Sequence, residues 1–371
     1  MSGTNVLAIE VNGMKFKNPF VLGSGPPGTN GKVIARAFER GWGGVVAKTI
    51  SLDSSKVSNV APRYGKLRSR ENNEVIGFEN IELISDRPFE IWLDEFRQVK
   101  KNYPDHMLIA SIMEEYNKDA WQKIVKVVQE TGVDGFELNL SCPHGLPERR
   151  MGAAMGQSPD IVREVVGWVK EVSKIPVWAK MTPNVTDITQ PAMAAVESGA
   201  DGIAAINTIL SIIAVDLKTM RPQPTVEGYT VPGGYSGQAV RPIALRHVME
   251  LGRTIGKKVS ISGIGGIETA EDAAQFIALG ASTVQICTGA MLRGFEMIDE
   301  LTADLTKFVV DKKCNNVREM VGVALPYFST HASLVDSQKK AKISRAGEGR
   351  RDDEWSGDKI REQTAALMST D

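Results

Sequence analysis

The chain has 371 residues, of which 42% are hydrophobic and 24% charged, an ordinary composition for a globular protein with one large core or two modest ones. Its 44 basic and 45 acidic residues nearly cancel, so neither a nucleic acid nor an anionic membrane surface is indicated as a partner. No apolar run approaches the roughly 20 residues of a membrane helix, and the first residues lack the basic and apolar regions of a signal peptide.

The three cysteines, Cys142, Cys287 and Cys314, are far apart, and no C-x-x-C pair occurs. This spacing argues against a disulfide framework, a zinc ribbon and an iron–sulfur cluster. A reducing compartment is the simplest interpretation, so we expect a cytoplasmic protein. A plastid is the alternative location if the chain is the mature form of a processed precursor.

Short apolar runs alternate with longer amphipathic runs along the chain. Strands are predicted at 20–25, 44–49, 107–112, 135–140, 177–180, 202–207, 258–263 and 282–288, and helices at 31–40, 89–101, 119–131, 158–173, 189–198, 242–255, 269–279 and 295–310. Eight strand–helix units in this order predict an α/β fold, a (β/α)8 TIM barrel with the helices outside the strands. A doubly wound sheet is the alternative, although that fold has less need of eight evenly spaced strands.

Two long polar stretches, 51–87 and 208–238, exceed the length of plain connections. They are predicted to be structured insertions in loops that follow strands. The charged sequence at 339–342 and 350–354 predicts a helical and charged C-terminal tail, either a solvated, partly disordered appendage or a docking arm. We therefore divide the chain into a barrel domain, residues 1–312, and a C-terminal extension, residues 313–371.

In a barrel of this kind, the carboxyl ends of the strands meet at one site. The seventh predicted strand ends in a glycine-rich turn at 263–266, and the eighth ends at 287–289 before a helix. Backbone N–H groups of such turns bind phosphate, and barrels build phosphate sites at these two strands. A phosphate site is therefore predicted, with tight turns that bind no ligand as the alternative. The spacing of the glycines in the turn at 263–266 does not match the dinucleotide-binding fingerprint.

Lys48 and Lys180 each lie near the end of an apolar strand. A lysine in that position must reach water or meet an anion or a polar ligand. A cofactor ring that becomes anionic on reduction would suit both lysines. The alternative for each is a structural ion pair with Glu114 or Asp187.

The fourth strand ends in the segment Asn139-Leu140-Ser141-Cys142-Pro143-His144-Gly145. An amide, a hydroxyl, a thiol and an imidazole therefore lie together where Pro143 and Gly145 end the strand. A thiol with an ordinary pKa of about 8.5 can exchange a proton near neutral pH, so Cys142 is a candidate general acid or base. Simple packing is the alternative for Cys142. His144 has no second ligand at metal spacing, so no metal site is predicted.

Several segments resemble the dihydropyrimidine dehydrogenases, which form one family of FMN-binding barrels with the dihydroorotate dehydrogenases. The resemblance covers about residues 8–310 and is carried by 18–20, 48–49, 109–113, 116–118, 139–145, 179–188, 207–208, 235–237 and 240–245. His144 favours the former group, because the dihydroorotate dehydrogenases usually carry Asn there. Segments 151–154 and 353–358 are similar to the short plant-type enzymes.

The resemblance implies FMN as the cofactor and a pyrimidine base as the substrate. The implied FMN contacts are Ser24, Lys48, Thr49, Lys180, Gly237, Ile264, Gly265, Gly266, Cys287 and Thr288. The implied pyrimidine contacts are Asn117, Asn139, Leu140, Ser141, Asn207 and Thr208, and the implied proton donor is Cys142. Asparagine amides suit uracil or thymine because each amide offers a donor and an acceptor to a neutral ring, whereas orotate would require an added cation.

The activity that the resemblance implies is reduction of uracil or thymine to the 5,6-dihydropyrimidine, with hydride from reduced FMN to C6 and a proton from Cys142 to C5. The chain lacks the clustered cysteines of an iron–sulfur site, so the electron source is open. One possibility is that NADPH, or alternatively NADH, reduces FMN directly. The other is that a separate reductase docks and supplies the electrons. A dihydroorotate dehydrogenase and a non-catalytic barrel subunit that relays electrons are the alternatives. A homodimer is expected because barrels with long insertions often dimerise.

Overall fold

The computed structural model describes residues 5–140 and 152–344 of the chain. The chain divides into two compact units, residues 1–325 and residues 326–371. The first unit contains every strand that the structure describes. The second contains one described α-helix, α11 (His331–Ser344), whose side chains through residue 340 are almost all exposed.

Eight parallel strands close into a barrel in the order β10-β15-β16-β3-β4-β7-β8-β9. Their bounds are β3 (Phe20–Leu22), β4 (Gly44–Val46), β7 (Met107–Ile112), β8 (Gly135–Asn139), β9 (Val177–Lys180), β10 (Gly202–Ala205), β15 (Ser260–Ile264) and β16 (Thr283–Ile286). Strand β16 pairs with β3, so the last strand joins the first. The predicted TIM barrel is confirmed, and the predicted doubly wound alternative is excluded.

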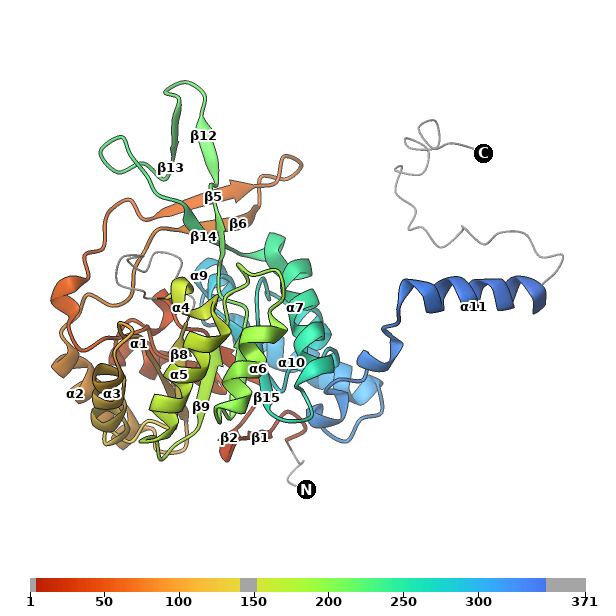
Figure 1. Cartoon of the computed structure of the whole chain (residues 1–371), viewed down its shortest axis with the longest axis horizontal. Helices are drawn as coiled ribbons and strands as arrows, with labels where there is room; N and C mark the ends of the chain where they lie inside the picture. Colours follow the sequence, from red (N-terminus) through yellow and green to blue (C-terminus); the bar gives the residue numbers. More distant parts are fainter. Residues whose placement is uncertain (1–4, 141–151, 345–371) are drawn as a thin grey trace. The chain divides into compact units, whose positions relative to one another are not determined.

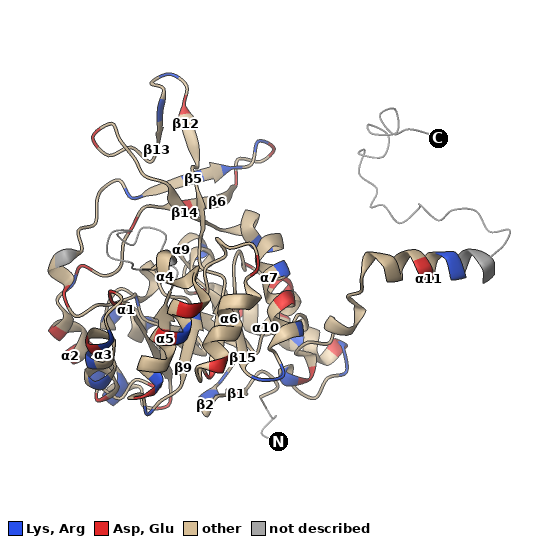
Figure 2. Ribbon diagram, in the orientation of Figure 1, with Lys and Arg blue, Asp and Glu red and all other residues tan. Residues whose placement is uncertain are grey.

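Helices surround the barrel (Figure 1). They are α1 (Gly31–Arg40), α2 (Phe89–Asn102), α3 (Lys118–Gln129), α4 (Ala153–Gly156), α5 (Pro159–Lys170), α6 (Thr189–Glu197), α7 (Arg241–Thr254), α8 (Ala270–Ala278), α9 (Thr288–Arg293) and α10 (Met297–Asp311). Ser158 caps α5, as its sequence indicates, and Thr269 forms a capping box with Asp272 at α8. Charged residues lie on the outer helices α2, α3 and α5 (Figure 2).

A short hairpin, β1 (Ile9–Val11) with β2 (Met14–Phe16), lies at the end of the barrel opposite β12 in Figure 1. Its alternate residues Ile9, Val11 and Met14 are buried. The ring of Phe16 stacks on Trp178 of β9 with 6.3 Å between ring centroids. The hairpin therefore covers the amino ends of the strands with apolar side chains. Its three-residue strands were not predicted.

The two long insertions combine into one antiparallel sheet over the other end of the barrel (Figure 1). We call this four-stranded sheet, of order β11-β14-β6-β5, the cover sheet. Strands β5 (Tyr64–Arg68) and β6 (Val75–Asn80) come from the first insertion, and β11 (Ile209–Ser211) and β14 (Gly233–Ser236) come from the second. The prediction of structured insertions is confirmed, and the cover sheet shows that the two form one element.

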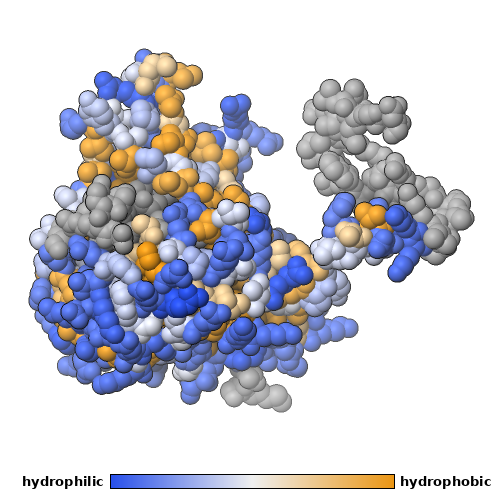
Figure 3. Space-filling view, in the orientation of Figure 1, coloured by the Kyte–Doolittle hydropathy of each residue, from blue (hydrophilic) through white to orange (hydrophobic). Residues whose placement is uncertain are grey.

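Between β11 and β14 the chain forms a projecting hairpin, β12 (Ala214–Asp216) with β13 (Arg221–Gln223). Leu217, Met220 and Tyr229, which lie in or beside this hairpin, are 79%, 71% and 78% exposed. Apolar side chains gather on this part of the surface in Figure 3. Among the described residues, no helix combines the length and the hydropathy that a membrane span requires.

Candidate active site

A cavity lies between the carboxyl ends of the barrel strands and the cover sheet. It encloses about 1090 Å³ of space, some of it open to solvent. Every FMN contact implied by the resemblance lines it: Ser24, Lys48, Thr49, Lys180, Gly237, Ile264, Gly265, Gly266, Cys287 and Thr288. Three of the implied pyrimidine contacts, Asn139, Asn207 and Thr208, line the same cavity. The barrel therefore brings together residues that lie up to about 260 positions apart in sequence.

A chain of hydroxyl and amide groups forms part of the cavity wall. Asn207 Nδ2 donates to Asn139 Oδ1 at 3.3 Å, and Asn139 Nδ2 donates to Thr49 Oγ1 at 3.0 Å. Thr49 Oγ1 in turn lies 3.2 Å from Ser24 Oγ and 2.8 Å from Ser111 Oγ. These bonds fix the orientation of the Asn139 amide, so its donor and acceptor edges are set before a ligand enters.

Both lysines of the cavity have carboxylate partners. Lys48 Nζ lies 3.0 Å from Glu82 Oε2, and Lys180 Nζ lies 3.1 Å from Glu137 Oε1. The partners considered from the sequence were wrong. Glu114 accepts the backbone N–H of Leu52, and Asp187 accepts that of Thr189. Both true partners approach from another strand or insertion, which sequence spacing does not reveal.

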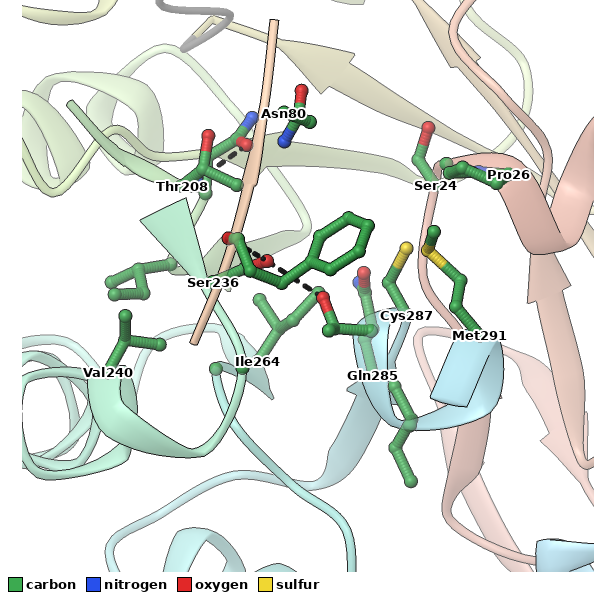
Figure 4. A pocket seen from close by; sticks show the side chains of 18 of the residues that line it. Ser24, Pro26, Asn80, Thr208, Ser236, Val240, Ile264, Gln285, Cys287 and Met291 are labelled. Carbon is green, nitrogen blue, oxygen red and sulfur yellow. Dashed lines mark hydrogen bonds between the residues drawn. The ribbon is translucent and has the colours of Figure 1, made fainter. Parts of the chain in front are cut away.

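The cover sheet and the segment after β6 contribute side chains that the sequence did not single out. Tyr64, Phe78, Asn80 and Glu82 line the cavity from the first insertion. Asn80 and Thr208 lie near each other on one side of the view in Figure 4, with Ser24, Cys287 and Met291 on the other. The length and polarity of stretch 51–87 were the available signal, but they could not say which of its residues face inward.

Glu82 connects the cover to the barrel. Its carboxylate accepts Arg63 Nη1 at 2.6 Å and the Tyr64 hydroxyl at 3.1 Å, in addition to pairing with Lys48. Burial, and after it the neighbouring Glu82 charge, raises the pKa of Tyr64 above its usual range. Tyr64 therefore remains a neutral hydrogen-bond donor at physiological pH.

The glycine turn after β15 and the start of α9 lie on one wall of the cavity. Gly266 has φ +74°, and a Cβ there would come within 2.6 Å of the Gly237 carbonyl oxygen, so the turn requires glycine. Ser236 Oγ lies 2.8 Å from Thr288 Oγ1, the contact drawn as a dashed line from Ser236 in Figure 4. Burial raises the pKa of the Cys287 thiol to about 11, so Cys287 does not ionise near neutral pH.

Four of the sequence-derived site residues are not placed in the cavity. Asn117 is the N-cap of α3, where its Oδ1 accepts the Ala120 N–H at 3.0 Å, and it is not among the residues that line the cavity. Leu140 is fully buried beside the cavity without lining it. Ser141 and Cys142 lie outside the residues that the structure describes, as does His144.

A family model described as dihydroorotate dehydrogenase matches residues 6–309. The chain belongs to the dihydroorotate dehydrogenase family. Within it, the chain is 53% identical to a chloroplastic dihydropyrimidine dehydrogenase (NADP(+)) of Arabidopsis thaliana, over 98% of this chain and 88% of that one. It is 44% identical to the NAD-dependent dihydropyrimidine dehydrogenase subunit PreA of Escherichia coli, over 86% of this chain and 77% of that subunit. The predicted resemblance is confirmed.

The fold of the dihydroorotate dehydrogenase family is also visible at low identity. A crystal structure of the dihydroorotate dehydrogenase of Eimeria tenella in complex with ferulenol matches this chain with a TM-score of 0.71 and 20% sequence identity. The match covers 87% of this chain and 89% of that one. The family and its named members make this chain an oxidoreductase, and the family implies a flavin.

The cavity fits the flavin that the dihydroorotate dehydrogenase family implies. The turn at Gly265 and Gly266 has no side chains, and Ser236 and Thr288 supply hydroxyls beside it, so this wall suits a phosphate. The two ammonium groups and the wall of amides suit a polar ring. Gln285 Oε1 is buried without a hydrogen-bond partner among the described residues, which leaves one acceptor of the cavity wall unused.

Proposed function

We propose that this chain reduces uracil or thymine to the corresponding 5,6-dihydropyrimidine. The observation that carries the proposal is the set of amides in the cavity, Asn80, Asn139 and Asn207, together with the Glu82 carboxylate. Each amide can pair with the alternating N–H and C=O edge of a neutral ring. The names of the Arabidopsis and Escherichia coli relatives support the same substrate class.

The pairing of the cavity lysines favours a neutral pyrimidine over orotate. Lys48 already pairs with Glu82 and Lys180 with Glu137, so neither of these two ammonium groups is an uncompensated cation for the carboxylate of orotate. Steady-state assays test the choice: uracil with NADPH should turn over, and dihydroorotate with fumarate or a quinone should not. Turnover of dihydroorotate alone would replace this proposal with the dihydroorotate dehydrogenase alternative.

We propose FMN as the bound flavin, held through its phosphate by the turn at Gly265 and Gly266 with Thr288, and through its ring by Lys48 and Lys180. When bound, FMN supplies two-electron hydride chemistry.

We propose NADPH as the electron donor, which agrees with the printed name of the Arabidopsis relative. NADH is the alternative, which agrees with the printed name of the Escherichia coli relative. Anaerobic reduction of the bound flavin by each nucleotide, with and without uracil, separates the two donors.

We propose that Cys142 is the proton donor to C5 of the pyrimidine. It follows Asn139 by three residues, and Asn139 lines the cavity at the end of β8. Asn139 and Asn207 would orient the ring, and the general acid would complete the addition of hydrogen across its C5–C6 bond. Cys142→Ala should keep the flavin bound and reducible while turnover falls by about 10²–10⁴. Turnover close to that of the wild type would rule Cys142 out.

The state of assembly is a separate part of the proposal. The bacterial relative is named as a subunit, which supports a separate reductase as the alternative to direct reduction. Protein purified alone that is yellow and active would dismiss both that partner and the non-catalytic role.

For the chain itself we propose a homodimer through the projecting hairpin, because a hairpin of two short strands with exposed Leu217 and Tyr229 is poorly stable alone. Leu217→Lys should then lower the sedimenting mass.

We propose a plastid or the cytoplasm as the compartment, with the plastid supported by the printed name of the Arabidopsis relative. Detection of the native protein by antibody in fractionated source cells would distinguish the two.

A further inference from the structure

One carboxylate holds the backbone that follows the turn at Gly265 and Gly266. Asp272, in the first turn of α8, accepts the backbone N–H of Glu268 at 3.0 Å and that of Thr269 at 3.1 Å, both through Oδ2. Thr269 Oγ1 in turn accepts the backbone N–H of Asp272 at 3.1 Å, which completes the capping box of α8. The bond from Glu268 is additional to the capping box, and it ties the chain just after the turn to the helix.

The same carboxylate ties the turn to α7. Asp272 Oδ1 forms an ion pair with Nη1 of Arg241, the first residue of α7. A Cβ at Gly266 would come within 3.1 Å of Arg241 Cβ, and one at Gly265 would come within 2.5 Å of Ala244 Cβ. The turn therefore packs directly against the first turn of α7, and Asp272 is bonded to both sides of this contact.

Asp272 itself does not reach the cavity. Its side chain is 7% exposed. Among the described residues, neither Asp272 nor Arg241 lines the cavity, whereas Gly265, Gly266 and Ile267 do. Asp272 can therefore affect a ligand only through the backbone and the guanidinium that it holds. Bonds from N–H groups to a carboxylate are stronger than those between neutral groups, so they leave this backbone little freedom.

We propose that Asp272 is a positioning residue for the flavin phosphate, which keeps the turn at Gly265 and Gly266 in the conformation that receives it. This inference rests on the proposed FMN site and assigns a role to a residue that touches no ligand. Backbone N–H groups bind phosphate well only when their directions are set before the ligand arrives. Loss of the carboxylate should therefore weaken a ligand that carries a phosphate and spare one that does not.

The test compares FMN with riboflavin, which has the same ring and ribityl chain but no phosphate. The full-length protein, freed of bound flavin, is titrated with each ligand, and flavin fluorescence gives the two Kd values. Asp272→Ala should raise the Kd of FMN by roughly 10- to 150-fold, as expected for one lost hydrogen bond to a charged group. The Kd of riboflavin should stay close to that of the wild type.

Two variants of the same capping box separate positioning from simple loss of stability. Asp272→Glu keeps a carboxylate, and Glu is a usual residue at this position of a capping box, so it should restore most of the affinity for FMN. Thr269→Ala removes the cap of α8 but leaves the bonds from Asp272 to Glu268 and Arg241. It should lower the midpoint of thermal unfolding and leave the ratio of the two Kd values unchanged.

Three results would overturn the proposal. Equal losses of FMN and riboflavin affinity in Asp272→Ala would show that the carboxylate only supports the fold. A selective loss of FMN affinity in Thr269→Ala would show that the helix cap is sufficient. A selective gain of FMN affinity in Asp272→Ala would show that the carboxylate opposes the phosphate or withholds Arg241 from it.

Asp272→Asn covers the case in which Asp272→Ala does not fold. It keeps the volume of the side chain, but an amide has a single acceptor oxygen and cannot hold both the turn and Arg241. The same selective loss of FMN affinity is expected, and equal losses of both ligands would again overturn the proposal.

Neither a pyrimidine nor a nucleotide enters these titrations. A wild-type protein that binds neither flavin would refute the proposed cofactor, and this inference with it. A wild-type protein that binds FMN while Asp272→Ala loses no affinity for it would refute the role of Asp272 alone. A selective loss of FMN affinity would support that role whether or not the protein reduces uracil.

Discussion

Two asparagines that the sequence treated alike have different surroundings in the structure. Asn139 is held by Thr49 and Asn207 in the cavity wall, while Asn117 caps α3. We expect Asn139→Ala to lower kcat/KM for uracil by roughly 5- to 150-fold, the equivalent of about 1–3 kcal/mol for a lost buried hydrogen bond. Asn117→Ala should instead cost about 1 kcal/mol of stability through the lost cap.

Steady-state kinetics and urea unfolding of both variants check this difference. An equal loss of kcat/KM in the two would return Asn117 to the binding site. The role of Asn117 in pyrimidine binding stays a prediction, and the structure places this residue at the start of α3, outside the cavity lining. The sequence did not single out Asn80, which lines the cavity. Asn80 lies in the first insertion, and the sequence does not determine the path of that insertion over the barrel.

Glu79 is a fully buried carboxylate in β6. It accepts the backbone N–H of Ile213 at 2.7 Å and that of Gly233 at 2.9 Å, which ties the second insertion to the first. Burial raises its pKa above the ordinary value of 4.5 despite these hydrogen bonds. The folded state therefore binds this proton more tightly than the unfolded chain, so the contribution to stability is largest below 4.5 and falls as the pH rises through the folded pKa.

Glu79→Gln removes this titration, so the comparison with the wild type should depend on pH. As the pH falls through the raised folded pKa to below 4.5, the free energy of unfolding of the wild type should rise relative to that of the variant, by about 1.4 kcal/mol for each unit by which the pKa is raised. Urea unfolding at several pH values measures the difference. A difference that stays constant with pH would show that Glu79 titrates alike in the folded and unfolded chains.

At the scale of elements, the strands and helices of the barrel were predictable and the cover sheet was not. The strand predicted at 107–112 and the helix predicted at 31–40 have those bounds in the structure, because each is a continuous apolar or amphipathic run between clear end signals. Strand β14 instead pairs with β6, whose residues lie about 160 positions earlier. No local pattern specifies a pairing across that distance.

Two glycines in different elements should respond in opposite directions to alanine. In the turn after β15, Gly266→Ala meets a positive φ and the Gly237 carbonyl, and we expect it to cost about 1–2 kcal/mol of stability and to weaken flavin binding. In the middle of α5, a Cβ at Gly167 meets nothing within 4 Å, and Gly167→Ala should stabilise by about 0.5–1 kcal/mol. Thermal unfolding and flavin titration measure both. Flavin affinity unchanged in Gly266→Ala would remove the turn from the proposed phosphate site.

At the scale of the whole molecule, residues 1–325 form a compact unit with its own core. We expect a chain that ends after Leu325 to fold, to bind flavin and to unfold with the same midpoint as the full chain. Size-exclusion chromatography, absorbance of the flavin and thermal unfolding check this. Loss of flavin from the shortened chain would assign a role to residues 326–371.

Most of the whole-molecule architecture followed from the sequence, because eight repeated strand–helix units leave few ways to bury their apolar faces. The cavity residues followed in part, since strand ends must converge in a barrel. The partners of Lys48 and Lys180 did not follow, because Glu82 and Glu137 reach them across space from other elements.

The seam between β3 and β16 sets the order of events during synthesis. Ser24 follows the first barrel strand and Thr288 follows the last, and both line the cavity. A nascent chain that ends before β16 lacks one wall of the cavity and leaves β3 and β15 with unpaired edges. Pairing over such a sequence separation is slow, and unpaired strand edges invite aggregation. The ribosome must therefore release nearly the whole barrel before a flavin can be retained, so interrupted translation products should be insoluble and colourless.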